Sequence, residues 1–118
     1  MDAMLKEKAI HDDVRAIREK AGLSQEQLAH LLGTSWVSVS RWEREISQPS
    51  THSRARLERL QKLMERVGDA LPRKEIPHFL HAAHPLLRGY RPVDLLDSDY
   101  AFDDLLAFVD AARSGDMA

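Results

Sequence analysis

Side chains that could bind DNA are concentrated between residues 22 and 43. An arginine can donate two parallel hydrogen bonds to O6 and N7 of a guanine, and Arg41 is our candidate for this contact. Glutamine and serine side chains, together with the N–H groups at the start of a helix, commonly bind phosphate oxygens. This segment is therefore suited to holding and reading a duplex rather than to making or breaking a covalent bond.

The sequence offers no comparable arrangement for catalysis or for a metal ion. It has no cysteine, which excludes disulfides and thiolate zinc sites, and it has no glycine-rich phosphate loop or nucleophile elbow. His78, His81 and His84 are spaced three apart, but Pro85 interrupts a continuous helix there and no Cys or carboxylate completes a ligand set. We therefore expect no enzyme activity, no cofactor and no metal.

Helices are expected to position the candidate residues, because sustained period-2 alternation of β-branched residues is absent. Apolar spacing and capping residues predict four helices in the first half. The first helix carries Ile10, Val14, Ile17 and Ala21 and ends at Gly22. The second runs from Ser24 to Gly33, and Gln27 completes a capping box with Ser24. The third runs from Thr34 or Ser35 to about Glu43, and the fourth runs from Ser50 or Thr51 to Gly68.

The second half is also expected to be helical, which makes the fold class all-α. Pro72 suits the first turn of a helix that continues to about His81. Pro85, Gly89 and Pro92 would then punctuate short helical pieces. A last helix is expected from the capping residue Ser98 to Gly115.

The second and third predicted helices form a helix-turn-helix pattern. Ala29 is small where the helices cross, and Gly33 permits the left-handed backbone of the turn. Leu28, Leu32, Val39 and Trp42 are expected to face inward. The outward residues of the third helix, which would enter the major groove, are then Trp36, Val37, Ser40 and Arg41.

The run G-L-S-Q-E-Q-L-A-H-L-L-G-T-S resembles the Cro/C1/Xre family of helix-turn-helix repressors, over about residues 11–67. The resemblance implies that Gln25 binds a phosphate and that Arg18 pairs with Glu43. The DNA-contacting residues would be Gln25, Ser35, Trp36, Val37, Ser38, Ser40, Arg41 and Arg44. Glu45 stands where the family usually has glycine, so the turn after the third helix must differ or carry strain.

The run H-P-L-L-R-G-Y-R-P-V-D-L-L-D-S at residues 84–98 resembles the toxin-binding domain of Xre/MbcA/ParS-type antitoxins. The resemblance implies an antitoxin that neutralises a cognate toxin, often an NAD-consuming RES-type enzyme, and that represses its own operon. The domains would be 1–68, which binds DNA, and 69–118, which binds the toxin and supports dimerisation. The toxin-binding residues would be Arg88, Tyr90, Asp116, Met117 and Ala118.

The charge distribution agrees with two separate tasks. Residues 1–67 carry 12 Lys and Arg against 10 Asp and Glu, whereas residues 68–118 carry 5 against 9. The halves therefore have net charges of +2 and −4, and only the first suits contact with phosphates. In the stretch from Asp94 to the C-terminus seven aspartates meet Arg113 alone, so we expect an acidic surface that faces solvent or a basic partner.

Several alternatives remain open from the sequence. The protein could be a plain repressor whose second half only dimerises, or a helix-turn-helix that no longer binds DNA. The basic residues Arg54, Arg56, Arg59, Lys62 and Arg66 could form a second phosphate-contacting face or an ordinary solvated one. The expected partners are operator DNA, a toxin and a second copy of the chain. The expected location is the cytoplasm, because a chain without cysteine fits a reducing compartment. No membrane span is expected, since no apolar run approaches the roughly 20 residues that span a bilayer.

Overall fold

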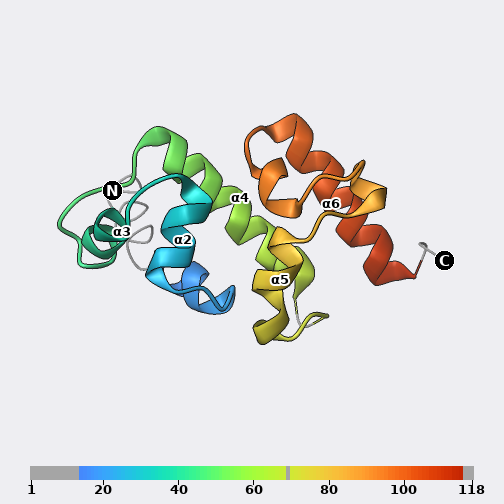
Figure 1. Cartoon of the computed structure of the whole chain (residues 1–118), viewed down its shortest axis with the longest axis horizontal. Helices are drawn as coiled ribbons and strands as arrows, with labels where there is room; N and C mark the ends of the chain where they lie inside the picture. The colour runs from blue at the N-terminus through green and yellow to red at the C-terminus, as the bar shows by residue number, and fades with distance from the viewer. Residues whose placement is uncertain (1–13, 69, 116–118) are drawn as a thin grey trace, which may run out of the picture. The chain divides into compact units, whose positions relative to one another are not determined.

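The computed structural model describes residues 14–68 and 70–115 of the 118-residue chain. Within these ranges the chain is helical and contains no β-strand, which confirms the predicted all-α class (Figure 1). None of the helices in the described part is long and apolar enough to cross a membrane. The predicted toxin-binding residues Asp116, Met117 and Ala118, and Ile10 of the first predicted helix, lie outside the described residues.

The chain divides into two compact units, Met1–Leu57 and Glu58–Ala118. The division falls inside helix α4, Thr51–Val67. Ser50 begins this helix by accepting a hydrogen bond from the Ser53 N–H at 3.1 Å. Each unit is described separately below.

The first unit consists of a helical segment at residues 14–20, α2 (Gln25–Leu32), α3 (Trp36–Glu43) and the beginning of α4. The predicted capping box is present, because Ser24 Oγ accepts from the Gln27 N–H at 3.0 Å and Gln27 Oε1 accepts from the Ser24 N–H at 2.8 Å. Gly33 ends α2 with φ 71°, the left-handed conformation that the turn requires. Local signals thus set the angle at which α3 leaves α2.

The core of the first unit follows the predicted inward pattern. Leu28, Leu32, Val39 and Trp42 are all buried. They are joined by residues of the first helical segment and of the turn before α2, namely Val14, Ile17, Ala21 and Leu23. Because α2 and α3 share this core, the opposite face of α3 is fixed toward solvent.

The turn after α3 is strained at Glu45, which adopts φ 62°. The Ile46 N–H donates to the Arg41 carbonyl at 2.9 Å, and the Glu45 N–H donates to the Trp42 carbonyl at 3.1 Å. This pair of bonds is the Schellman motif, in which the left-handed position is usually glycine. The chain therefore keeps the tight turn, and Glu45 adopts the unfavourable left-handed conformation. Of the two outcomes expected from the sequence, a different turn or a strained one, the structure has the strained one.

The second unit contains the end of α4 followed by five short or medium elements: η1 (Arg73–Glu75), α5 (Ile76–His81), η2 (Pro85–Leu87), η3 (Pro92–Leu96) and α6 (Asp99–Ser114). The predicted helix from Pro72 begins as a 3₁₀ turn and becomes α-helical only at Ile76. Ser98 and Gly115 cap α6 as expected. η3 packs against both α5 and α6, around the buried side chains Leu80, Leu96 and Leu105.

Arginines of α4 neutralise two aspartates of α6, which corrects the expectation that these carboxylates have no partner but Arg113. Arg59 contacts Asp99 Oδ1 at 3.1 Å and also donates to the Leu96 carbonyl at 2.8 Å. Arg66 contacts Asp110 at 2.6 Å. The same contacts occupy two of the five basic residues that could have formed a second phosphate-binding face, because those guanidinium groups are bonded within their own unit.

Candidate functional site

The exposed face of α3 presents most of the predicted DNA-contacting residues together. Trp36 and Val37 are 53% and 41% exposed, Arg41 and Arg44 are exposed, and Ser40 is half-buried. Trp36 lies four residues before Ser40, Val37 lies four before Arg41, and Arg41 lies three before Arg44, so these residues share one side of the helix. The structure therefore brings the predicted recognition residues onto one surface with two positive charges.

Two serines fix the start of this helix. Ser35 is the N-cap of α3, and its Oγ accepts a hydrogen bond from the Ser38 N–H at 3.2 Å. The Ser35 and Ser38 hydroxyl oxygens also lie 3.1 Å apart. The side chain of Ser35 thus serves the helix itself, while its exposure leaves the remaining hydrogen-bonding capacity available to a phosphate.

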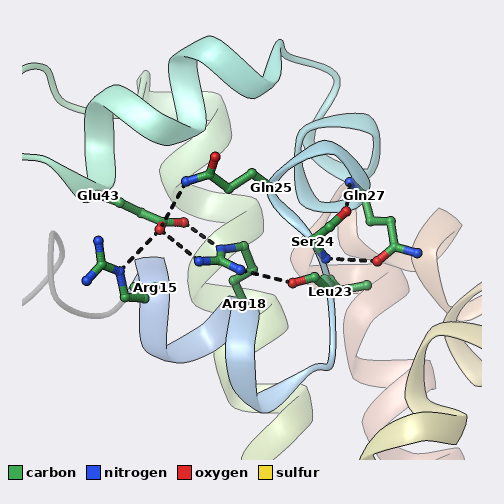
Figure 2. A network of polar contacts seen from close by, with 7 residues as sticks. All are labelled: Arg15, Arg18, Leu23, Ser24, Gln25, Gln27 and Glu43. Carbon is green, nitrogen blue, oxygen red and sulfur yellow. Dashed lines mark hydrogen bonds and ion pairs between the residues drawn. The ribbon is translucent and has the colours of Figure 1, made fainter.

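The carboxylate of Glu43, a residue of α3, is bonded to Arg15, Arg18 and Gln25 (Figure 2). The side chain of Glu43 has no exposed area, whereas that of Arg18 is 17% exposed and that of Arg15 is 57% exposed. Arg18 Nε donates to Glu43 Oε2 at 2.7 Å and Arg18 Nη2 donates to Oε1 at 2.9 Å, a bidentate pair. The two residues that the family resemblance pairs are therefore in direct contact.

This network sets the ionisation of Glu43. Burial alone would raise the pKa of its carboxyl, but hydrogen bonds from Arg18, Gln25 and Arg15 outweigh burial and hold the pKa below its ordinary value. The pKa of Arg18 is raised, chiefly by its hydrogen bond to Glu43. Glu43 thus stays charged at neutral pH, and its charge is compensated inside the unit rather than displayed beside the recognition face.

Gln25 connects the network to the predicted phosphate contact. Its Nε2 donates to Glu43 Oε1 at 3.3 Å, and it is the first residue of α2, where backbone N–H groups are free to meet an anion. Arg15, whose Nε lies 3.3 Å from Glu43 Oε1, was missed by the sequence analysis. Its position one helical turn before Arg18 was the available signal.

The second unit carries an open groove of about 670 Å³. Its lining includes Arg88 and Tyr90, the two predicted toxin-binding residues that the structure describes. Leu86, Tyr90 and Tyr100 are large side chains with exposed surface there. An exposed apolar and aromatic groove with charged residues at its edge is typical of a protein-binding surface.

The half of this groove that α6 provides was not predicted from the sequence. Tyr100, Asp104, Ala107 and Phe108 line it, and they recur at spacings of three and four residues. This face is distinct from the buried face of α6, which carries Phe102, Leu105, Leu106 and Val109, and the helical period alone could have identified it.

The loop that presents Arg88 and Tyr90 is held by His84. The His84 side chain accepts a hydrogen bond from the Leu86 N–H at 3.2 Å. The backbone N–H of His84 donates to the Tyr90 carbonyl at 3.2 Å. Its carbonyl accepts from the Leu87 and Gly89 N–H groups, and its ring meets the ring of Phe108 edge-on at 4.6 Å. Arg88 adopts φ 59° within this loop.

The histidines do not assemble into a metal site among the residues described. His81 Nδ1 lies 3.0 Å from the Pro77 carbonyl oxygen, and His84 is engaged with Leu86. The described part of the chain holds no group of three or more His, Cys, Asp or Glu side chains placed to bind a metal ion.

The chain is similar to mycobacterial cidal antitoxins over most of its length. A family described as "Helix-turn-helix" matches residues 14–68. The mycobacterial cidal antitoxin MbcA of Mycobacterium tuberculosis is 28% identical over 97 residues, covering 82% of this chain and 85% of the relative. The probable mycobacterial cidal antitoxin Rv3188 of the same organism is 32% identical over 95 residues, covering 77% of this chain and 80% of the relative.

A solved structure has the same fold. A chain in the crystal structure of the M. tuberculosis MbcT–MbcA toxin–antitoxin complex superposes with a TM-score of 0.77 and 26% sequence identity. The alignment covers 92% of this chain and 96% of that one.

Proposed function

The chain belongs to the family of the mycobacterial cidal antitoxins, and on this premise we propose that it neutralises a cognate toxin and represses its own operon. The observation that carries the proposal is the presence, in one chain, of a helix-turn-helix with an exposed cationic face and of an exposed apolar groove at Arg88 and Tyr90. The protein acts by binding its two partners and not by catalysis.

The DNA-binding role uses the face of α3. Five residues bind phosphates and fix the orientation of α3 on the duplex, because phosphate contacts position a protein without selecting sequence. They are Gln25, Ser35, Ser38, Ser40 and Arg44. Arg41 reads a guanine in the major groove. A homodimer would place two copies of α3 about one turn of DNA apart, roughly 34 Å, and would read an inverted repeat. A single unit with so few basic residues makes too few phosphate contacts for tight binding.

The toxin-binding role uses the second unit. Arg88 and Tyr90 contact the toxin from the groove, and Asp116, Met117 and Ala118 extend this contact. Tyrosine and arginine are enriched among the residues that dominate protein interfaces, which supports the choice of these two. By the resemblance noted above, the toxin is a RES-type enzyme that consumes NAD, and the protein works in the cytoplasm where NAD and DNA are both present.

Co-expression with the product of the adjacent gene tests the antitoxin role. Growth and cellular NAD should fall when that product is expressed alone and recover when this protein is co-expressed. The double variant Arg88→Ala/Tyr90→Ala should lose the rescue while it still shifts operator DNA in a gel, which serves as the folding control. Absence of any interaction between the wild-type protein and the adjacent gene's product would refute the antitoxin role and leave the plain repressor.

A further inference from the structure

The recognition helix exposes two large apolar side chains where a DNA-binding surface would be expected to be polar. Trp36 and Val37, the first two residues of α3, are 53% and 41% exposed, whereas the other apolar residues of the helix, Val39 and Trp42, are buried in the core. The core therefore does not need Trp36 and Val37. Their exposure keeps apolar area in water until a partner covers it.

The charges around this apolar pair indicate what the partner is. The exposed charged residues of α3 and its cap are Arg41 and Arg44, both positive. The carboxylate of the helix, Glu43, is fully buried and bonded to arginines, so it does not repel an anion at this surface. An apolar patch beside guanidinium groups matches the major groove of DNA, where the thymine C5 methyl is the apolar group and phosphates line the edges.

We propose that Val37, with Trp36 beside it, contacts the C5 methyl group of a thymine in each half of the operator. The proposal rests on the DNA-binding role proposed above, in which α3 enters the major groove. It adds a direct determinant of sequence preference that does not depend on hydrogen bonding, because a methyl group distinguishes thymine from the other bases by apolar contact alone.

The geometry of α3 also places this thymine relative to the base that Arg41 reads. Val37 precedes Arg41 by four residues, and at about 1.5 Å per residue the two lie about 6 Å apart along the helix axis. Base pairs in B-DNA are about 3.4 Å apart. When α3 lies along the groove, the thymine is therefore one or two base pairs from the guanine bound by Arg41.

Replacing thymine by uracil tests the proposal, because it removes only the methyl group. The operator is first selected from a randomised pool of duplex DNA with the full-length protein. Each thymine is then replaced in turn by deoxyuridine, and affinities are measured by titration. One position per half-site should weaken binding of the wild type by about fourfold, the effect expected for one buried methyl group.

The variants assign that loss to the apolar pair. Val37→Ala should bind more weakly and discriminate less between thymine and uracil, and Trp36→Ala/Val37→Ala should bind both duplexes equally. Ile46→Ala, which truncates an exposed apolar residue outside α3, should keep the wild-type discrimination. Circular dichroism confirms that the variants fold.

Other outcomes separate this proposal from the proposed function. A selection that enriches no sequence would refute sequence-specific DNA binding itself. Specific binding without uracil sensitivity at any position, or sensitivity that survives in the double variant, would overturn the methyl contact and leave the DNA-binding role intact. Loss of dimerisation in the double variant by sedimentation, with discrimination unchanged, would assign the apolar pair to a second copy of the chain and also overturn the proposal.

Discussion

Replacing Glu43 by alanine should destabilise the first unit by about 3 kcal/mol. The side chain of Glu43 is fully buried, and the substitution leaves Arg18, itself 17% exposed in its side chain, without its bidentate partner. Removing one member of a buried ion pair costs about 3–5 kcal/mol, because a charge stays buried without compensation. We take the lower end, because Arg18 also donates to the Leu23 carbonyl at 3.2 Å and is not sealed from water.

Tryptophan fluorescence is suited to the measurement, because both tryptophans of the sequence, Trp36 and Trp42, lie in α3. For a unit the size of Met1–Leu57, a loss of about 3 kcal/mol corresponds to a fall in the thermal midpoint of roughly 12–24 °C. The matched control is Arg15→Ala, which removes an exposed partner of the same carboxylate and should cost less than about 1 kcal/mol. Equal midpoints for Glu43→Ala and the wild type would refute the reasoning that the pair holds α3 in place.

Three further predictions follow from the backbone, the carboxylate and the recognition face. Glu45→Gly should stabilise the protein by about 0.5–1 kcal/mol in denaturant titration, because glycine adopts φ 62° without strain, although it loses more backbone entropy on folding. Gly33→Ala should destabilise the protein by a similar amount, because Gly33 has φ 71° and no atom lies within 4 Å of the added carbon. A loss of stability in Glu45→Gly together with a gain in Gly33→Ala would show that the strain lies elsewhere. Because the pKa of Glu43 is lowered on folding, its contribution to stability should be complete above the ordinary glutamate pKa and should be lost as the pH falls through the lowered value. The free energy of unfolding of Glu43→Gln should therefore change less with pH in this acid range than that of the wild type. Parallel pH profiles for the two proteins would contradict this reasoning. Arg41→Ala should reduce discrimination at one base pair by about 1–3 kcal/mol in competition binding, whereas Gln25→Ala should weaken binding to all sequences alike; uniform loss for Arg41→Ala would make it a phosphate contact.

The helix boundaries of the first unit could be predicted because their causes are local. A capping box needs only Ser24 and Gln27, three residues apart, and the end of α2 needs only Gly33. The departure at Glu45 was also visible in the sequence, although only the structure decides that the tight turn is kept and the strain accepted. In the second unit, Pro72 indicated where helical structure begins but not that its first turn is 3₁₀, since the same residue suits either kind of helix.

Contacts between distant residues could not be predicted from local patterns. Asp99 and Asp110 seemed unpaired in the sequence because their partners, Arg59 and Arg66, precede them by 40 and 44 residues. The groove was only half predicted for a related reason. The motif around Arg88 and Tyr90 indicated one wall, whereas Tyr100 and Phe108 on α6 complete it only once η2 and η3 have folded against that helix.

In both units, a residue outside the proposed contact surface bonds to a segment that carries proposed contact residues. Glu43 is buried, yet it bonds to Gln25, whose position at the start of α2 would decide how the protein meets a phosphate. The His84 side chain likewise organises the loop that carries Arg88 and Tyr90, because its Nδ1 accepts from the Leu86 N–H and its ring packs edge-on against Phe108. Side chains held in place before binding lose less conformational entropy when a partner arrives. Variants of Glu43 and His84 should therefore weaken recognition of DNA and of toxin, respectively, although neither residue need touch the partner.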